Sequence, residues 1–98
     1  MIDAVELIDN TFLRQFELKV DDELAKIEYS LQERKIFLTK LEVPEAVNNQ
    51  EFTENFLRIV MDNIKERNIS VVPTSPPIAK FMRRNRSYKS MLPVGVRI

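Results

Sequence analysis

The first half of the chain alternates between apolar and polar positions. Apolar residues recur at even spacing in two segments, namely Phe12, Phe16, Leu18 and Val20, then Ala25, Ile27, Tyr29 and Leu31. A side-chain period of two is typical of strands with one buried face, so we expect one strand ending near residue 20 and a second over 25–31. Polar turns are expected at 21–23 and 32–34. A third strand is expected at 35–43, closed by Pro44.

A weaker strand is expected before these, at 5–8, with Asp9 and Asn10 as its turn. Four sequential strands joined by short turns predict an antiparallel meander.

After residue 48 the apolar spacing changes to that of an amphipathic helix. The apolar positions are Phe52, Phe56, Ile59, Val60 and Ile64. They follow the 3.6-residue period of a helix with one buried face. Asn48 is predicted to be the N-cap, with Glu51 three residues later in the manner of a capping box. Arg67 and Asn68 are expected to end this helix.

The last third of the chain predicts a short strand and a short helix. Residues 69–72 are apolar enough for a strand buried on both faces. Pro76 and Pro77 are typical of a helix N-terminus, and Ile78, Phe81 and Met82 would form its apolar face. The strand–helix–strand step is expected to be a right-handed parallel crossover. The pattern therefore predicts a single α/β domain over residues 1–98.

The composition excludes several kinds of functional site. The 98 residues include one glycine, Gly95, and neither histidine nor cysteine. A glycine-rich phosphate loop, a thiol nucleophile, a histidine base and the usual zinc sites are therefore absent, and we expect no metal. The 15 cationic side chains balance the 15 anionic ones, so no nucleic-acid partner is expected. No apolar run reaches the roughly 20 residues that span a bilayer, so we expect a cytoplasmic protein without a membrane partner.

Four short motifs follow one another along the chain. They are Ile27-Glu28-Tyr29, Leu38-Thr39-Lys40-Leu41-Glu42-Val43-Pro44-Glu45, Val71-Val72-Pro73, and Arg83-Arg84-Asn85-Arg86-Ser87-Tyr88. In their order and spacing they resemble the GNAT-type N-acetyltransferase superfamily, and within it a subfamily of small GNAT-like proteins. The resemblance covers about residues 10–92. It implies a mixed GNAT-like sheet, an antiparallel meander followed by a strand–helix–strand crossover and a C-terminal helix. It also implies acetyl-CoA-dependent acetylation of an amine. Lys40-Leu41 departs from the His-Thr that the subfamily typically shows before Glu-Val-Pro.

The resemblance also identifies candidate cofactor-binding residues. The superfamily holds the pyrophosphate of acetyl-CoA with a Q/R-x-x-G-x-G/A loop at the start of the main helix. The matching window here reads Asn48, Asn49, Gln50, Glu51, Phe52 and Thr53, so Glu51 and Thr53 replace both glycines. Val43 would contribute a main-chain amide to hold the thioester. The window is either a residual CoA loop or a plain helix cap. We expect CoA to bind weakly or not at all, because a carboxylate beside phosphate is unfavourable.

Four residues are candidate catalytic groups under this resemblance. Glu42 or Glu28 could deprotonate an amine, or each could be an ordinary exposed strand carboxylate. Tyr88 could be the C-terminal general acid of many GNAT enzymes, or it could pack against the last helix. Ser75 stands where the subfamily carries a suspected catalytic cysteine, or it is a loop hydroxyl, since the chain has no histidine to activate it.

Two functions remain open from the sequence. The first is an N-acetyltransferase acting on an unidentified amine. The second is a degenerate GNAT fold without cofactor that serves as a binding module. A basic cluster, Lys80, Arg83, Arg84, Arg86 and Lys89, could meet the 3′-phosphate of CoA or a nucleic-acid backbone, or it could be a solvated helix face. The oligomeric state is not predicted.

Overall fold

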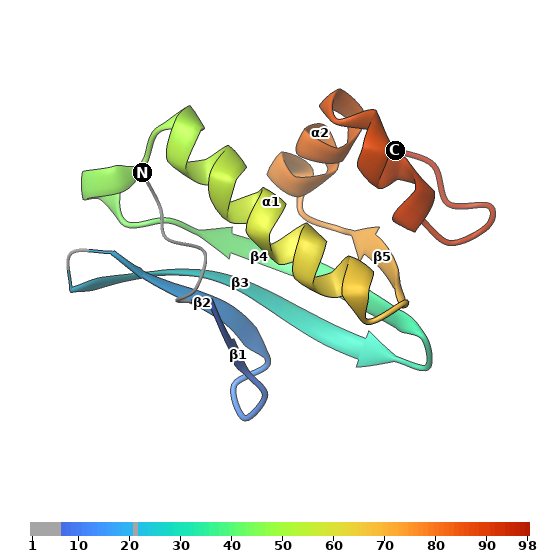
Figure 1. Ribbon diagram of the computed structural model, residues 1–98, viewed down its shortest axis with the longest axis horizontal. Helices are drawn as coiled ribbons and strands as arrows, with labels where there is room; N and C mark the ends of the chain where they lie inside the picture. The colour runs from blue at the N-terminus through green and yellow to red at the C-terminus, as the bar shows by residue number, and fades with distance from the viewer. Residues whose placement is uncertain (1–6, 21) are drawn as a thin grey trace.

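A computed structural model describes residues 7–20 and 22–98, and its centre is one five-stranded sheet (Figure 1). The strands are β1 Ile8–Asn10, β2 Gln15–Val20, β3 Glu23–Gln32, β4 Lys35–Glu42 and β5 Ser70–Pro73. They lie side by side in the order β1-β2-β3-β4-β5. The first three pairings are antiparallel and the β4–β5 pairing is parallel, which confirms the predicted meander and the parallel pair.

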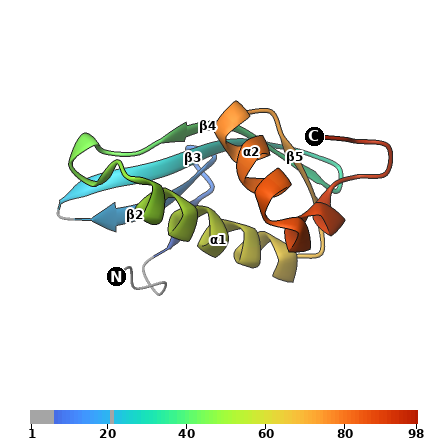
Figure 2. The ribbon, with the colours of Figure 1, turned by 90° about the horizontal axis from the view of Figure 1, so that it is seen from above.

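Two α-helices cover one face of this sheet. They are α1, Gln50–Glu66, and α2, Pro76–Arg84, and two short 3-10 helices, η2 Glu45–Val47 and η3 Arg86–Met91, follow β4 and α2. Figure 2 shows α1 running along the strands and α2 at the β4–β5 end of the sheet. The core lies between these layers. Its fully buried larger side chains are Phe16, Leu18, Ile27, Ile36, Leu38, Phe56, Leu57, Val60, Met61, Ile64, Ile78 and Met82.

Strand alternation determines which side chains enter that core. In β3, Ala25, Ile27 and Tyr29 are buried against the helices, whereas Lys26 and Glu28 point to the uncovered face. The register of the β3–β4 pair shifts between Glu28 and Tyr29, which is a β-bulge. The bulge inserts an extra residue in β4 and reverses the alternation there. As a result Leu41, paired with Ile27, packs against the core.

The first hairpin differs from the sequence prediction. Asp9 and Asn10 lie in β1 and not in a turn. Of the predicted strand at 5–8, residues 5 and 6 lie outside the described residues, and only Ile8 belongs to β1. Phe12 is 90% exposed in the turn that precedes β2 and is not a buried strand residue. The turn is held by the Asn10 side chain, whose Oδ1 accepts a hydrogen bond from the Leu13 N–H at 3.0 Å. The prediction that Phe12 belongs to the strand, which came from its even spacing to Phe16, was therefore wrong.

Two other expectations about burial were wrong. Leu31 is 44% exposed, because β3 extends past its last pair with β2, Gln15↔Glu28. Val72 in β5 is only half-buried, because the helices cover one face of the sheet and leave the other open. The sheet therefore has one apolar face and one face that carries mixed side chains.

Among residues 7–20 and 22–98, four non-glycine residues adopt the left-handed conformation at the ends of these elements. They are Arg14, Asp22, Glu33 and Asn68, with φ between 57° and 64°. Glycine normally takes such positions at little cost, but the single glycine of the chain lies in the C-terminal tail. At these turns, residues other than glycine therefore adopt the left-handed conformation.

Candidate functional site

The helix α1 begins one residue later than predicted. Its N-cap is Asn49, whose side chain accepts a hydrogen bond from the Phe52 N–H at 2.8 Å. Asn48 instead ends η2, a turn that the sequence analysis did not foresee, and its N–H bonds to the Glu45 carbonyl. Glu51 therefore occupies the second helical position, where it cannot complete the expected capping box.

The first turn of α1 offers two main-chain donors. The Thr53 N–H already bonds to the Asn49 carbonyl at 3.1 Å, and Asn49 caps Phe52. Helix geometry leaves the amides of Gln50 and Glu51 without an intrahelical acceptor, at the positive end of the helix dipole. The Glu51 side chain is exposed and adds a negative charge at this end. The arrangement suits an anion that binds the two free amides with modest strength.

A pocket of about 210 Å³ lies between the first half of α1 and α2. It is lined by Asn49, Gln50, Thr53, Glu54, Leu57, Pro77, Lys80, Phe81 and Arg84. The pocket therefore brings together two predicted groups of residues. Asn49, Gln50 and Thr53 are predicted cofactor-binding residues, and Lys80 and Arg84 belong to the basic cluster. Its walls combine apolar side chains with cationic ones, which suits a ligand that has both apolar and phosphate parts.

The strand β4 continues past its neighbour β5. The last β4–β5 pair is Leu38↔Pro73, after which the chain turns away towards α2. The Leu38 carbonyl accepts hydrogen bonds from the amides of Thr74 and Ser75 and from the Thr74 hydroxyl, at 3.1–3.3 Å. Residues 39–42 therefore have no strand partner on the β5 side within the described part of the chain. Val43 follows and packs partly against the core.

Glu28 and Glu42 lie on the uncovered face of the sheet, away from the helices. Lys26 contacts both carboxylates, at 3.9 Å and 3.5 Å, and Lys40 contacts Glu42 at 3.0 Å. The hydrogen bond from Lys40 is the main reason that the pKa of Glu42 is lowered, and it likewise raises the pKa of Lys40. A lowered pKa makes Glu42 a weaker base. The structure brings these two carboxylates together but on the side opposite the pocket.

Tyr88 and Ser75 lie on the helical side and are engaged in packing. The Tyr88 hydroxyl donates a hydrogen bond to Asp62 Oδ1 at 3.1 Å, and its ring stacks on Phe81 with centroids 5.7 Å apart. Burial, followed by the nearby Asp62 charge, raises the pKa of Tyr88. Ser75 is the N-cap residue of α2, 6% exposed, and its carbonyl accepts the amides of Ile78 and Ala79. The four candidate catalytic residues are therefore not assembled into one site.

Glu54 lines the pocket and Arg58 contacts Glu54, and neither was among the predicted site residues. Glu54 also contacts Gln50 and Arg84. The spacing of 50, 54 and 58 places all three α1 residues on one helical face, and this signal could have identified the group. The contact with Arg84 depends on the packing of two helices.

The structure also bears on metals and membranes. No group of three or more His, Cys, Asp or Glu side chains suited to a metal ion is found among residues 7–20 and 22–98. Over the same ranges, no helix is both long enough and apolar enough to cross a bilayer.

Comparisons with known proteins identify the family. A model of the GCN5-related N-acetyl-transferase family matches residues 15–91. The chain belongs to this family. The solution structure of a GCN5-like protein from Staphylococcus aureus has the same fold, with a TM-score of 0.70 over 98% of this chain and 94% of that chain, at 17% sequence identity. No curated protein sequence matches the chain significantly. The GNAT resemblance and the predicted fold class are thereby confirmed.

Proposed function

We propose that this GCN5-related N-acetyl-transferase family member binds acetyl-CoA between α1 and α2 and transfers the acetyl group to an amine. One observation supports this most directly. The pocket joins the N-terminal turn of α1 to Lys80 and Arg84. In addition, main-chain groups at the end of β4 lack a strand partner on the β5 side among the described residues. These are the groups that a ligand with a diphosphate and a thioester requires.

The chain fits such a ligand, with an opposing charge at the start of α1. The free amides of Gln50 and Glu51 would bind the diphosphate, and Lys80 and Arg84 would supply positive charge. The negative charge of the Glu51 carboxylate would repel the diphosphate. At 4 Å a like charge costs about 4 kcal/mol at an effective dielectric of 20, but only about 1 kcal/mol in water. Because Glu51 is exposed, the lower value applies and binding is weak rather than abolished.

In acetyl transfer a C–N bond forms as the thioester C–S bond breaks, and the amine proton ends on the departing sulfur. The main-chain amide of Val43 would hold the carbonyl oxygen. Since Glu28 and Glu42 lie on the opposite sheet face, the amine must lose its extra proton to solvent before attack. Catalysis would then come from positioning the two reactants, which alone can contribute several kcal/mol.

A second function is supported by the separation of the candidate catalytic groups. Tyr88 is bonded to Asp62, Ser75 starts a helix, and the two glutamates contact lysines on the far face. A chain that has lost catalysis could retain the fold as a binding module. This alternative, a fold that has lost its cofactor, predicts no CoA binding.

Two measurements separate these functions. Titration calorimetry with CoA and acetyl-CoA tests binding, and thiol release from acetyl-CoA in the presence of a panel of small amines and peptides tests transfer. Lys80→Gln should weaken binding, whereas Lys19→Gln, on an exposed β2 residue paired with Asp22, should not. Binding with thiol release supports the enzyme, binding without thiol release refutes the transfer step, and no binding supports the module and excludes the first proposal.

A further inference from the structure

The carboxylate of Glu54 occupies a place in the pocket wall that a ligand phosphate could take. Its side chain is 22% exposed and lies in the second turn of α1. Oε2 lies 3.0 Å from Gln50 Nε2 and 3.1 Å from Arg84 Nη2, and Oε1 lies 3.6 Å from Arg58 Nη2. One carboxylate therefore contacts two guanidinium groups and an amide donor.

The two guanidinium groups come from different helices, and Arg58 is oriented by further contacts. Arg58, on α1, lies over the Phe81 ring at 6.0 Å and contacts the Asn85 side chain at 3.5 Å. Arg84 belongs to the last turn of α2 and lines the pocket. Guanidinium groups bind carboxylates and phosphates with the same planar geometry. A pair that converges on one carboxylate thus has the chemistry to receive a phosphate group.

We propose that Arg58 and Arg84 form an anion subsite for a ligand phosphate, and that Glu54 is its internal competitor. In the ligand-free chain Glu54 satisfies both arginines, and a phosphate ester must displace it. The identity of the ligand as CoA rests on the proposed function, but the subsite would accept any diphosphate or phosphate ester of suitable size. A dianionic phosphate displaces the carboxylate more readily than a singly charged group, so Glu54 selects for highly charged ligands.

A purely structural role for Glu54 makes a different prediction. Ion pairs between partly exposed side chains contribute little to stability, typically below 1 kcal/mol. If the pairs only hold α1 to α2, removing the charge of Glu54 should leave anion affinity unchanged or reduce it. If Glu54 competes with the ligand, the same change should increase the affinity.

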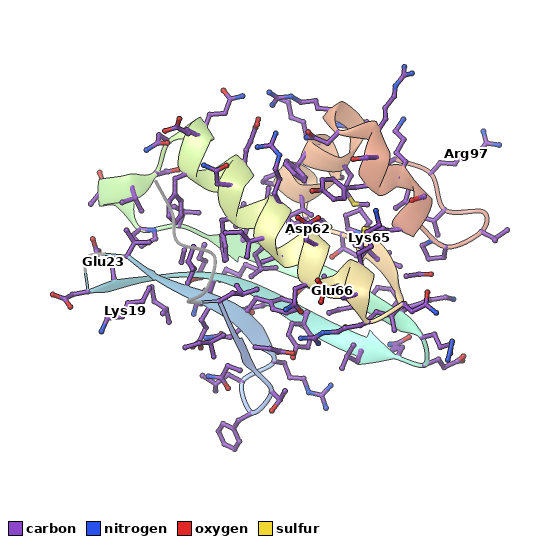
Figure 3. The ribbon with its side chains drawn as sticks, in the orientation of Figure 1. Lys19, Glu23, Asp62, Lys65, Glu66 and Arg97 are labelled. Carbon is purple, nitrogen blue, oxygen red and sulfur yellow. The ribbon has the colours of Figure 1, made fainter. Side chains whose placement is uncertain are left out.

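The test compares Glu54→Gln with the wild type by titration calorimetry, using inorganic pyrophosphate and CoA as separate probes. Glutamine keeps the size of the side chain and removes its charge. We expect pyrophosphate to bind about tenfold more tightly, which corresponds to ~1.4 kcal/mol. Glu66→Gln is the matched control, because it changes the net charge equally in the last turn of the same helix (Figure 3), and it should alter affinity less than twofold. Adding Arg84→Gln to Glu54→Gln should abolish the gain.

Each outcome decides one of the two proposals. Tighter pyrophosphate binding in Glu54→Gln, with the control unchanged, supports the subsite. If CoA then binds neither protein, the subsite stands and the acetyl-CoA proposal fails. Unchanged, weaker or undetectable pyrophosphate binding in Glu54→Gln refutes the competitor role, whatever CoA does. An equal gain in Glu66→Gln also refutes it, because the effect would then be one of net charge.

Discussion

Replacing Glu51 and Thr53 by glycine tests whether the first turn of α1 limits CoA binding. The structure separates the effects of the two positions. Glu51 contributes an exposed negative charge beside a free amide, whereas the Thr53 amide is already bonded to the Asn49 carbonyl. Glycine at 53 therefore adds space but no new donor. Most of the gain should come from position 51.

The expected size follows from the exposure of Glu51. Removing a like charge about 4 Å from a phosphate in a water-like dielectric contributes about 1 kcal/mol, or roughly fivefold in Kd. Glycine in a helix costs about 1 kcal/mol relative to alanine and less relative to glutamate or threonine, so the double variant should be about 1 kcal/mol less stable. For a domain of this size that lowers Tm by about 4–8 °C. The variant should thus bind more tightly while it melts earlier.

Thermal melting with and without CoA distinguishes these effects, because bound ligand raises Tm whatever the starting stability. Glu51→Gln serves as the control, since it removes the charge without freeing the backbone and should give nearly the whole gain. If Thr53→Gly gives the gain and Glu51→Gln does not, the electrostatic reasoning is wrong. If no variant shows a CoA-dependent shift, the block lies elsewhere, and the Lys40-Leu41 substitution becomes the next candidate.

Three further predictions concern stability. Phe56→Ala should lower the free energy of unfolding by about 3–5 kcal/mol, because the ring is fully buried; an unchanged urea midpoint would show that the ring is not in the core. Asn49→Ala should cost about 1 kcal/mol and Asn48→Ala almost nothing, because only Asn49 caps α1; equal losses in chemical denaturation would contradict this assignment. Burial and the hydrogen bond to Asp9 raise the pKa of Tyr29 from 10.0 to about 12, so the unfolded chain loses this proton first. Its contribution to stability is complete below pH 10 and declines towards pH 12, and Tyr29→Phe should remove that part of the decline in pH-dependent melting.

The periodic patterns predicted the main elements because each is buried on one face only. The alternation in β2 and β3 and the 3.6-residue spacing in α1 both arise because each element contacts one apolar layer. Phe16, Ile27 and Phe56 lie in this layer, as expected. The wrong predictions of burial concern residues whose spacing does not show where a strand or its neighbour ends. Phe12 keeps an even distance from Phe16 but lies in a turn, and Leu31 continues the alternation of β3 beyond the end of its neighbour.

The candidate site was predicted in part. The family resemblance located the window at the start of α1, and the structure places Asn49, Gln50 and Thr53 at a pocket. The separation of Glu28 from the helical side could also have been predicted, since it alternates with buried Ile27 and Tyr29. The contact between Glu54 and Arg84 could not, because it depends on how two helices pack.

The shortage of glycine also affects how the molecule can move. The four left-handed turn residues have side chains that limit the backbone angles open to them, both folded and unfolded. Loops of this kind do not readily change conformation around a ligand. Adjustment to a bound molecule should therefore come from side-chain rotation and from small shifts of α2 against α1, while the turns between strands keep their shape. In amide hydrogen exchange, ligand-dependent changes should then concentrate in the two helices.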